Sequence, residues 1–199
     1  MKAIFFDLGN VLVMYDARIA AQKFAKLLNV TEEEVWDEIF GSDLERAFTE
    51  GKISPHEFFE RLRGRFSKLI SYEIFTEIWI NIFWLNKRME RLVTLLSEHY
   101  PLYLISNTNE LHFDFIRKRF SVLDHFKEYF PSHWVGHRKP SAAIFEHALR
   151  NAKVKAKEAV FIDDVAEFVE GARHLGINGI HFESQSKLEQ EFRKLKIIF

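Results

Sequence analysis

After Met1 the chain reads Lys2-Ala3-Ile4-Phe5-Phe6-Asp7-Leu8-Gly9-Asn10-Val11, and this stretch decides the fold. A short apolar run ends abruptly at the carboxylate of Asp7, and Gly9 follows two residues later. A continuous apolar run of this length predicts a buried strand of the kind found in parallel sheets. A carboxylate at the end of such a strand lies where open α/β sheets bind their ligands.

The same pattern returns near the other end of the chain, in Ala159-Val160-Phe161-Ile162-Asp163-Asp164. Two strands that end in acids predict a cation site assembled from distant parts of the sequence. Strands and helices alternate over the second half of the chain, which predicts a Rossmann-like, doubly wound parallel sheet with helices on both faces. The further strands are expected at 101–106, 126–130 and 179–182, and the helices at 89–98, 109–120, 142–151, 167–175 and 187–196.

A helical insertion is expected directly after the first strand. Thr31-Glu32-Glu33-Glu34 has the pattern of a capping box, and Ser54-Pro55 places a proline at the first position of another helix. The segment contains several helical patterns and no convincing strand. The sequence therefore predicts an α/β core built from residues 1–15 and 87–199, and an inserted helical domain over residues 16–86.

Composition narrows the function classes. Hydrophobic residues make up 47% of the 199 positions, and the 28 Lys and Arg nearly balance the 29 Asp and Glu. A net charge of -1 gives no general attraction to nucleic acid or to an anionic membrane. No apolar stretch approaches the ~20 residues that span a bilayer. The chain has no cysteine, which excludes disulfides and thiolate metal sites and is typical of a reducing compartment. We expect a cytoplasmic protein without nucleic-acid or membrane partners.

Four polar features end strands or lie in loops, and each alone has an ordinary explanation such as a helix cap. They are Asp7 with Gly9, Ser106-Asn107-Thr108 at the expected opening of a helix, Arg138-Lys139-Pro140, and Asp163-Asp164. Taken together, in this order and over essentially the whole chain, they resemble the motifs of the haloacid dehalogenase superfamily. The resemblance is to its phosphatase-like branch, in which a helical cap is inserted after the first motif. It implies a hydrolase that cleaves a small phosphorylated metabolite through an aspartyl-phosphate.

The resemblance also implies a Mg²⁺ site. Asp7 would be the nucleophile and would share one oxygen with the metal, and Asp164 would be the second carboxylate ligand. Gly9 would offer its backbone carbonyl, and Asp163 would hold metal-bound water. The physical reasoning agrees, because a dianionic phosphate ester repels a carboxylate attacker unless a cation neutralises both. Hard oxygen ligands with open water positions suit Mg²⁺.

The resemblance assigns the phosphate contacts to the other two motifs. Ser106 would donate its hydroxyl to a phosphoryl oxygen, and the amides of Asn107 and Thr108 would donate from a helix start, where the dipole favours an anion. Lys139 would pair with Asp7 and the phosphate and stabilise charge in the transition state. Its neighbour Arg138 would reach the phosphate or an acid, or face solvent.

The chain departs from the family pattern at Gly9, where such phosphatases carry a second aspartate as general acid and base. General acid–base help is typically worth ~10²–10⁴ in rate. Three outcomes follow: a substrate with a good leaving group, such as a sugar 1-phosphate; a substitute group, such as Asn10 with a water; or little hydrolysis. The Leu-Gly-Asn-Val motif and His112 resemble sugar 1-phosphate phosphatases, which favours the first. Val165 and Phe168 also stand where related sequences carry polar residues.

Two alternatives to the phosphatase hypothesis stay open. One is a catalytically weak protein that binds a phosphorylated metabolite. The other is a 2-haloacid dehalogenase, although the acidic pair Asp163-Asp164 would repel a carboxylate substrate. The insertion would close over the site, and Tyr15, Trp36, Phe40 and Phe48 would either face the substrate or pack the helical domain. We expect a monomer or a homodimer.

Overall fold

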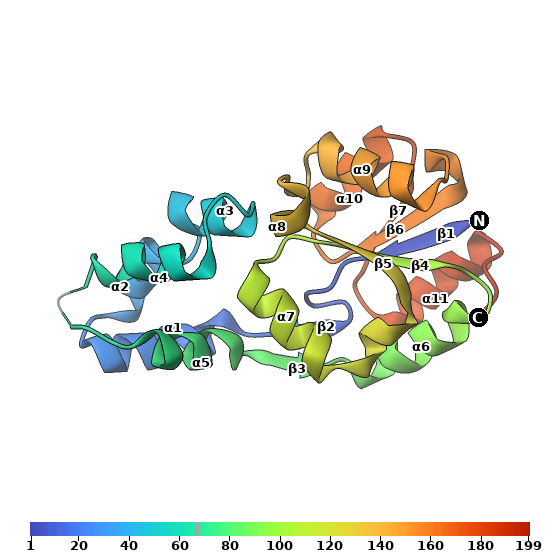
Figure 1. The fold of residues 1–199 in the computed structure, drawn as a ribbon. Coiled ribbons are helices and arrows are strands. Elements are labelled where there is room, and N and C mark those ends of the chain that lie inside the picture. The colour runs from blue at the N-terminus through green and yellow to red at the C-terminus, as the bar shows by residue number, and fades with distance from the viewer. Residues whose placement is uncertain (67) are drawn as a thin grey trace.

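The computed structural model of the protein describes residues 1–66 and 68–199, which fold into an α/β core and a group of helices at one end (Figure 1). The core sheet has five parallel strands in the order β5-β4-β1-β6-β7. The chain winds outward from the central β1 in both directions, which confirms the doubly wound sheet. The strands are β1 (Ala3–Phe6), β4 (Leu102–Ser106), β5 (Phe126–Pro131), β6 (Ala159–Asp163) and β7 (Asn178–His181).

The central strand is apolar throughout because it is buried on both faces. Ile4 and Phe6 pack against the helices α6, α7 and α11, whereas Ala3 and Phe5 pack against α9 and α10 on the other face. All four side chains are fully buried. The helices of the core are α6 (Lys87–Ser97), α7 (Glu110–Arg119), the short α8 (Ser132–Val135), α9 (Ala142–Ala152), α10 (Ala166–His174) and α11 (Gln185–Lys194). Short 3₁₀ turns lie at Ser121–His125 and Ala156–Glu158.

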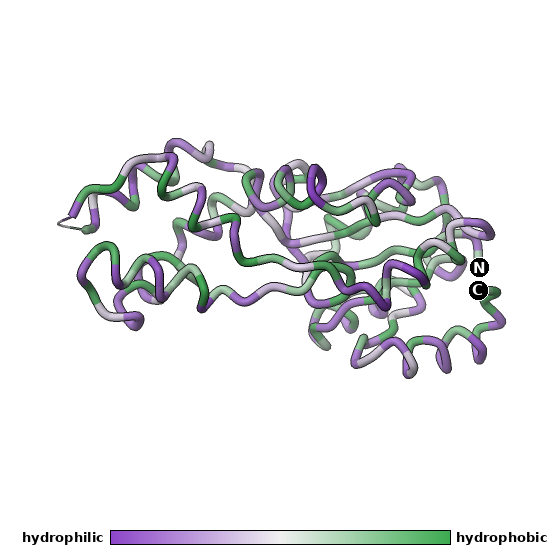
Figure 2. The backbone as a smooth tube through the Cα atoms, turned by 90° about the horizontal axis from the view of Figure 1, so that it is seen from below, coloured by the Kyte–Doolittle hydropathy of each residue, from purple (hydrophilic) through white to green (hydrophobic). Residues whose placement is uncertain are grey.

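Residues 16–86, the expected insertion, lie at the end of the molecule opposite both termini, as Figures 1 and 2 agree. Its helices begin as the sequence predicts: the capping box at Thr31 is complete, and Ser54 caps a helix whose first residue is Pro55. Its own aromatic core includes the stacked pair Phe48 and Phe58, with ring centroids 4.5 Å apart. The helices are α1 (Ala17–Leu28), α2 (Glu32–Glu38), α3 (Asp43–Thr49), α4 (Pro55–Arg63) and α5 (Tyr72–Ile80).

The expectation that residues 16–86 contain no strand is wrong at one place. β3 (Phe83–Leu85) pairs antiparallel with β2 (Val13–Tyr15), so that a two-stranded ribbon joins the insertion to the core. Because residues 78–85 are almost all apolar, the sequence does not show that α5 ends within them, with Asn81 as its C-cap. Because β3 is held by a partner about seventy positions earlier in the chain, local periodicity does not reveal it.

A second contact fixes the insertion against the core. The Ser132 hydroxyl, at the start of α8, donates to the Thr49 carbonyl oxygen of α3 at 2.6 Å and accepts from the Thr108 amide at 3.0 Å. Gly51, just after α3, packs tightly against the backbone of His133: a Cβ at Gly51 would lie 2.1 Å from the His133 carbonyl oxygen. The insertion is therefore held over the carboxyl ends of the sheet strands.

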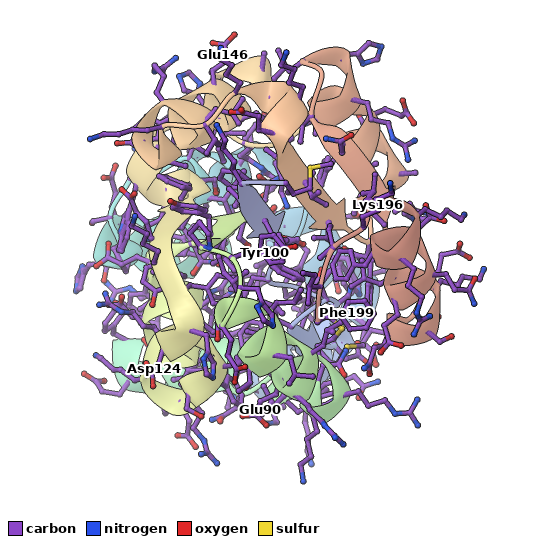
Figure 3. All side chains as sticks on the ribbon, turned by 90° about the vertical axis from the view of Figure 1, so that its right-hand side faces the viewer. Glu90, Tyr100, Asp124, Glu146, Lys196 and Phe199 are labelled. Carbon is purple, nitrogen blue, oxygen red and sulfur yellow. The ribbon has the colours of Figure 1, made fainter. Side chains whose placement is uncertain are left out.

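The far end of the core is an ordinary polar surface. Viewed from that end, Glu146, Lys196 and Asp124 project outward around the edge, with Tyr100 and Phe199 nearer the middle (Figure 3). The Tyr100 hydroxyl accepts from the Ile198 amide at 3.1 Å, which holds the C-terminal segment against the core. Among the described residues, no helix is both long and apolar enough to cross a membrane.

Candidate active site

Three carboxylates meet at the carboxyl ends of two neighbouring strands. Asp7 follows β1 and its amide donates to the Ile162 carbonyl of β6 at 2.8 Å, which continues the ladder between the strands. Asp163 ends β6 and Asp164 follows it. One oxygen from each of the three acids lies within 4.8 Å of the others. The structure thus brings together the two acidic clusters that the sequence singled out.

Lys139 ties two of these acids together. Its ammonium nitrogen Nζ lies 2.7 Å from Asp7 Oδ1, 2.5 Å from Asp163 Oδ2 and 3.2 Å from the Ile105 carbonyl oxygen. These three acceptors match the three protons of an ammonium group. Burial alone would lower the pKa of Lys139, but the two carboxylates outweigh it and the pKa is raised. The lysine is therefore a fixed positive charge beside Asp7.

Two aromatic rings enclose the same ammonium group. The Phe161 and Phe168 ring centroids lie 5.4 Å and 5.2 Å from Lys139 Nζ, within the range of cation–π attraction. Phe168 is one of the two departures from the family pattern noted in the sequence, and here its ring lies against the lysine. Sequence reasoning missed this role, although an aromatic residue one helical turn beyond Asp164 is its visible signal.

The acid cluster carries more negative charge than the lysine balances. Burial, and next the charge of Asp7, raise the pKa of Asp163, while Lys139 opposes them. Burial and Asp7 likewise raise the pKa of Asp164. Lys139 pairs with Asp7 and Asp163 and not with Asp164, and the oxygens of the three carboxylates are close enough to bind one ion. This all-oxygen donor set fits Mg²⁺.

Asn10 orients the outermost acid of the cluster. Its backbone has φ 54°, a left-handed conformation that asparagine tolerates better than most residues. Its side-chain amide donates to Asp164 Oδ2 at 3.2 Å, and the His181 ring nitrogen Nε2 lies 2.9 Å from the Asp164 carbonyl oxygen. The sequence suggested Asn10, together with a water, as a substitute acid–base group. In the structure its side chain bonds to Asp164.

The predicted phosphate contacts lie beside the acids, with one correction. Ser106 ends β4 and lines the cavity described below. Asn107 uses its side chain to hold the backbone of Lys139, accepting from its amide at 2.7 Å and donating to its carbonyl at 2.9 Å. The helix expected at 109–120 is α7 with Asn109 as its N-cap, so that Asn107 and Thr108 lie just before the helix and not in its first turn. The Thr108 amide instead donates to Ser132, so Asn107 is left to contribute through its backbone amide.

A cavity of about 460 Å³ lies between the acid cluster and the insertion. Its lining includes Tyr15, Trp36 and Phe40, whereas Phe48 is buried inside the insertion and does not line it. Glu45 of α3 also lines the cavity, and no pattern in the sequence identified it. The cavity is further lined by Asp7, Gly9, Thr49, Trp79, Phe83, Ser106, Asn109, His112, Arg138, Lys139, Asp164 and Phe168.

The side of the cavity where α5 meets α7 is held by a neutral histidine. The His112 ring nitrogen Nε2 lies 3.0 Å from the Trp79 carbonyl oxygen, and Nδ1 lies 3.1 Å from the Asn109 side-chain nitrogen. The Asn109 side-chain oxygen accepts from the His112 amide at 3.1 Å and from the Trp79 indole at 3.4 Å. Burial lowers the pKa of His112 to about 4, so Nε2 donates and Nδ1 accepts at neutral pH.

Comparison with known proteins identifies the class. Residues 1–176 match the family model of haloacid dehalogenase-like hydrolases, so the chain belongs to that family. It is 26% identical to a D-ribitol-5-phosphate phosphatase of Bacteroides thetaiotaomicron, over 96% of each chain. It is 28% identical to a sesquiterpene phosphatase of Aspergillus oryzae, over 98% of this chain and 96% of the relative.

A solved structure gives the same family. It is a haloacid dehalogenase family enzyme of Bacteroides thetaiotaomicron in complex with magnesium and inorganic phosphate. The two folds agree with a TM-score of 0.84 and 28% identity, over 94% of this chain and 98% of the other. The family expected from the four sequence motifs is thereby confirmed.

Proposed function

We propose that this protein is a Mg²⁺-dependent phosphatase that hydrolyses a small phosphate monoester through an aspartyl-phosphate on Asp7. The observation that carries the proposal is the meeting of Asp7, Asp163 and Asp164 within 4.8 Å, with Lys139 bonded to two of them. The names of two relatives as phosphatases, and the magnesium and phosphate bound in a related enzyme, support the same reaction.

The proposed first step is attack by a carboxylate oxygen of Asp7 on phosphorus. A bond forms between Asp7 and phosphorus, the bond to the leaving oxygen breaks, and that oxygen keeps the electron pair and takes a proton from a water molecule. Water then attacks the phosphorus and loses a proton to solvent, the bond between phosphorus and the Asp7 oxygen breaks, and inorganic phosphate leaves with the Asp7 carboxylate restored. The Ser106 hydroxyl, the Asn107 amide and the Lys139 ammonium group hold the phosphoryl oxygens, and fixed donors of this kind favour the charge of the transition state.

Magnesium would be held by Asp7, Asp164 and the Gly9 carbonyl, with Asp163 acting through water, and it would neutralise the charge between nucleophile and substrate. Residues 16–86 would act as a cap whose contacts at Ser132 and His112 exclude bulk water from the cavity. The proposal includes a small phosphorylated metabolite as substrate, a monomer or homodimer, and a cytoplasmic location.

The proposal is tested by hydrolysis of an activated aryl phosphate by the purified protein, with and without Mg²⁺. We expect turnover that is lost on chelation and restored by Mg²⁺. Asp7→Asn should abolish turnover, whereas Asp124→Asn, the same substitution at an exposed residue at the other end of the core, should leave it unchanged. Phosphate binding without turnover in the wild type would instead identify a binding protein.

A further inference from the structure

The cavity above the acid cluster has a continuous wall of aromatic rings. Six rings follow one another around it, and we call this set the aromatic wall. It consists of Trp36, Phe40, Trp79, His112, Phe83 and Tyr15. The centroids of successive rings lie 4.6, 5.5, 5.0, 4.8 and 6.0 Å apart, and two of the pairs are stacked within 17° of parallel. Such a surface fits a flat or unsaturated apolar group.

Four of the polar side chains in this part of the cavity, those of Asn109, His112, Trp79 and Thr49, bond to the protein itself. Asn109 and His112 bond to each other and to Trp79, whose indole nitrogen is engaged as well. The Thr49 hydroxyl lies 3.0 Å from the Glu45 carbonyl oxygen, to which it donates. A polyol needs several donors and acceptors, and an unpaired hydroxyl in such a cavity is costly. The wall therefore offers a polyol few partners.

Charge from the insertion is equally sparse. Among its described residues, Glu45 is the one charged side chain that lines the cavity. Burial raises the pKa of Glu45, and the Arg138 guanidinium of the core opposes that shift. Both of these side chains line the cavity. An uncharged apolar leaving group can therefore pack against the rings without leaving a charged partner in the insertion unpaired.

The apolar surface extends down to the proposed nucleophile. A Cβ on Gly9 would lie 3.0 Å from Cε1 of Tyr15, so the tyrosine ring covers the place where a longer side chain at position 9 would extend. At position 9, hydrocarbon surface therefore lies where an acidic side chain would otherwise extend. The first atoms of the leaving group would therefore also meet an aromatic ring.

We propose that the substrate is the phosphate monoester of an apolar, π-rich alcohol, either an arylalkyl or an isoprenyl alcohol, and that the aromatic wall binds its hydrocarbon part. The inference rests on the proposed phosphatase function and replaces the sugar 1-phosphate that the sequence suggested. A cavity of about 460 Å³ is in the range of sites that enclose small organic ligands.

The test compares phosphate esters of primary alcohols, each assayed against its own rate without enzyme. The full chain with Mg²⁺ is assayed on naphthylmethyl phosphate, farnesyl phosphate and ribitol 5-phosphate. We expect kcat/KM for at least one apolar ester to exceed that for the polyol ester by about tenfold or more, the size of effect that hydrophobic pockets give. The better apolar ester identifies which kind of alcohol the wall accepts.

A matched pair of variants shows whether the wall is responsible. Trp36→Ala removes a ring of the wall, and Trp84→Ala removes a similarly exposed tryptophan of β3 that does not line the cavity. We expect Trp36→Ala to raise KM for the preferred apolar ester about tenfold with little change in kcat. Neither variant should change KM for ribitol 5-phosphate by more than about twofold.

The outcomes separate this inference from the function beneath it. Faster hydrolysis of ribitol 5-phosphate than of both apolar esters would overturn the inference and leave the phosphatase standing. Equal effects of Trp36→Ala and Trp84→Ala would overturn the role of the wall. Absence of turnover with every ester, in the wild type and in Asp7→Asn alike, would overturn the phosphatase and the inference together.

Discussion

The two sides of the cavity are built in opposite ways. On the core side, charged atoms are fixed by strand register and by mutual bonds, as between Lys139, Asp7 and Asp163. On the side of the insertion, the surface is a set of rings from segments that are distant in the sequence, with little charge. The difference indicates a division of labour, in which the strand ends perform chemistry and the aromatic wall selects the substrate.

The largest test of this division removes the cation from the core side. Lys139→Met leaves Asp7 and Asp163 buried without a partner, which typically costs 3–5 kcal/mol, about the scale of loss we expect in the free energy of unfolding. We also expect kcat to fall by about 10²–10³, because a fixed donor to the phosphoryl group is lost. Urea unfolding and steady-state kinetics measure the two effects.

Lys127→Met is the matched control for this variant. Lys127 is an exposed lysine of β5, and its removal should change the free energy of unfolding by less than about 0.5 kcal/mol. If both lysine variants behaved alike, the claim that Lys139 is a structural and electrostatic partner of the acids would be refuted.

A pair of asparagine variants distinguishes the effect of orienting Asp164 from the effect of backbone strain. Asn10→Ala loses the bond to Asp164 Oδ2 and keeps a left-handed backbone, and Asn29→Ala places alanine in the same conformation at the end of α1. Both should lose about 1 kcal/mol of stability. Only Asn10→Ala should need about 10–100 times more Mg²⁺ for half-maximal activity, the usual cost of losing a ligand-orienting bond.

Magnesium titrations of activity in the two variants provide the readout. An unchanged magnesium requirement in Asn10→Ala would mean that the bond to Asp164 does not prepare the metal site.

The boundary between the two sides should respond to acid. His112 has a pKa of about 4 in the folded protein, below its ordinary value of 6.5, because it is buried. Between these values the unfolded chain binds the extra proton, so stability falls as the pH drops from 6.5 towards 4. We expect His112→Gln to reduce this dependence by about 1–2 kcal/mol, whereas His174→Gln, at an exposed histidine, should not.

The relevant quantity is the difference in unfolding free energy between pH 7 and pH 5 for each protein. Identical differences in the wild type and His112→Gln would contradict a buried neutral His112 at the contact between Trp79 and α7.

The smallest expected effect concerns the contact between Gly9 and Tyr15 of the aromatic wall. Gly9→Ala places a Cβ 3.0 Å from the Tyr15 ring, which must shift slightly, and Gly64→Ala meets only ordinary contacts of 3.7 Å and beyond. We expect Gly9→Ala to be the less stable of the two by about 0.5–1 kcal/mol. Thermal unfolding of both variants checks this, and equal stabilities would mean that Tyr15 does not rest against Gly9.

The core side could be predicted from the sequence because its signals are local. An apolar strand that ends in Asp7, and another that ends in Asp163 and Asp164, specify both the sheet and the edge at which the acids meet. The pairing of Lys139 with Asp7 was expected from the resemblance of the motifs to those of the haloacid dehalogenase superfamily, and the structure contains it. The bond from Asn107 to the backbone of Lys139 did not, because it depends on the paths of two loops.

The insertion side was less predictable because its structure depends on contacts between distant segments. β3 forms only through pairing with β2, and the aromatic wall is assembled from rings that lie as far apart in sequence as Tyr15 and His112. The sequence left open whether Phe40 faced the substrate or packed the helical domain; in the structure Phe40 lies just beyond the end of α2 and lines the cavity. Glu45 has no sequence signal at all, since its neighbours are set by packing of α3 over the strand ends.

The central claim is that Asp7 attacks phosphorus, and trapping the enzyme during turnover tests it most directly. Wild-type protein is mixed with Mg²⁺ and a phosphate ester, quenched in acid within milliseconds, digested and analysed by mass spectrometry. The account predicts the mass of one phosphoryl group on the peptide that contains Asp7, and none in Asp7→Asn. A phosphoryl group on another residue, or a normal rate of turnover by Asp7→Asn, would contradict it.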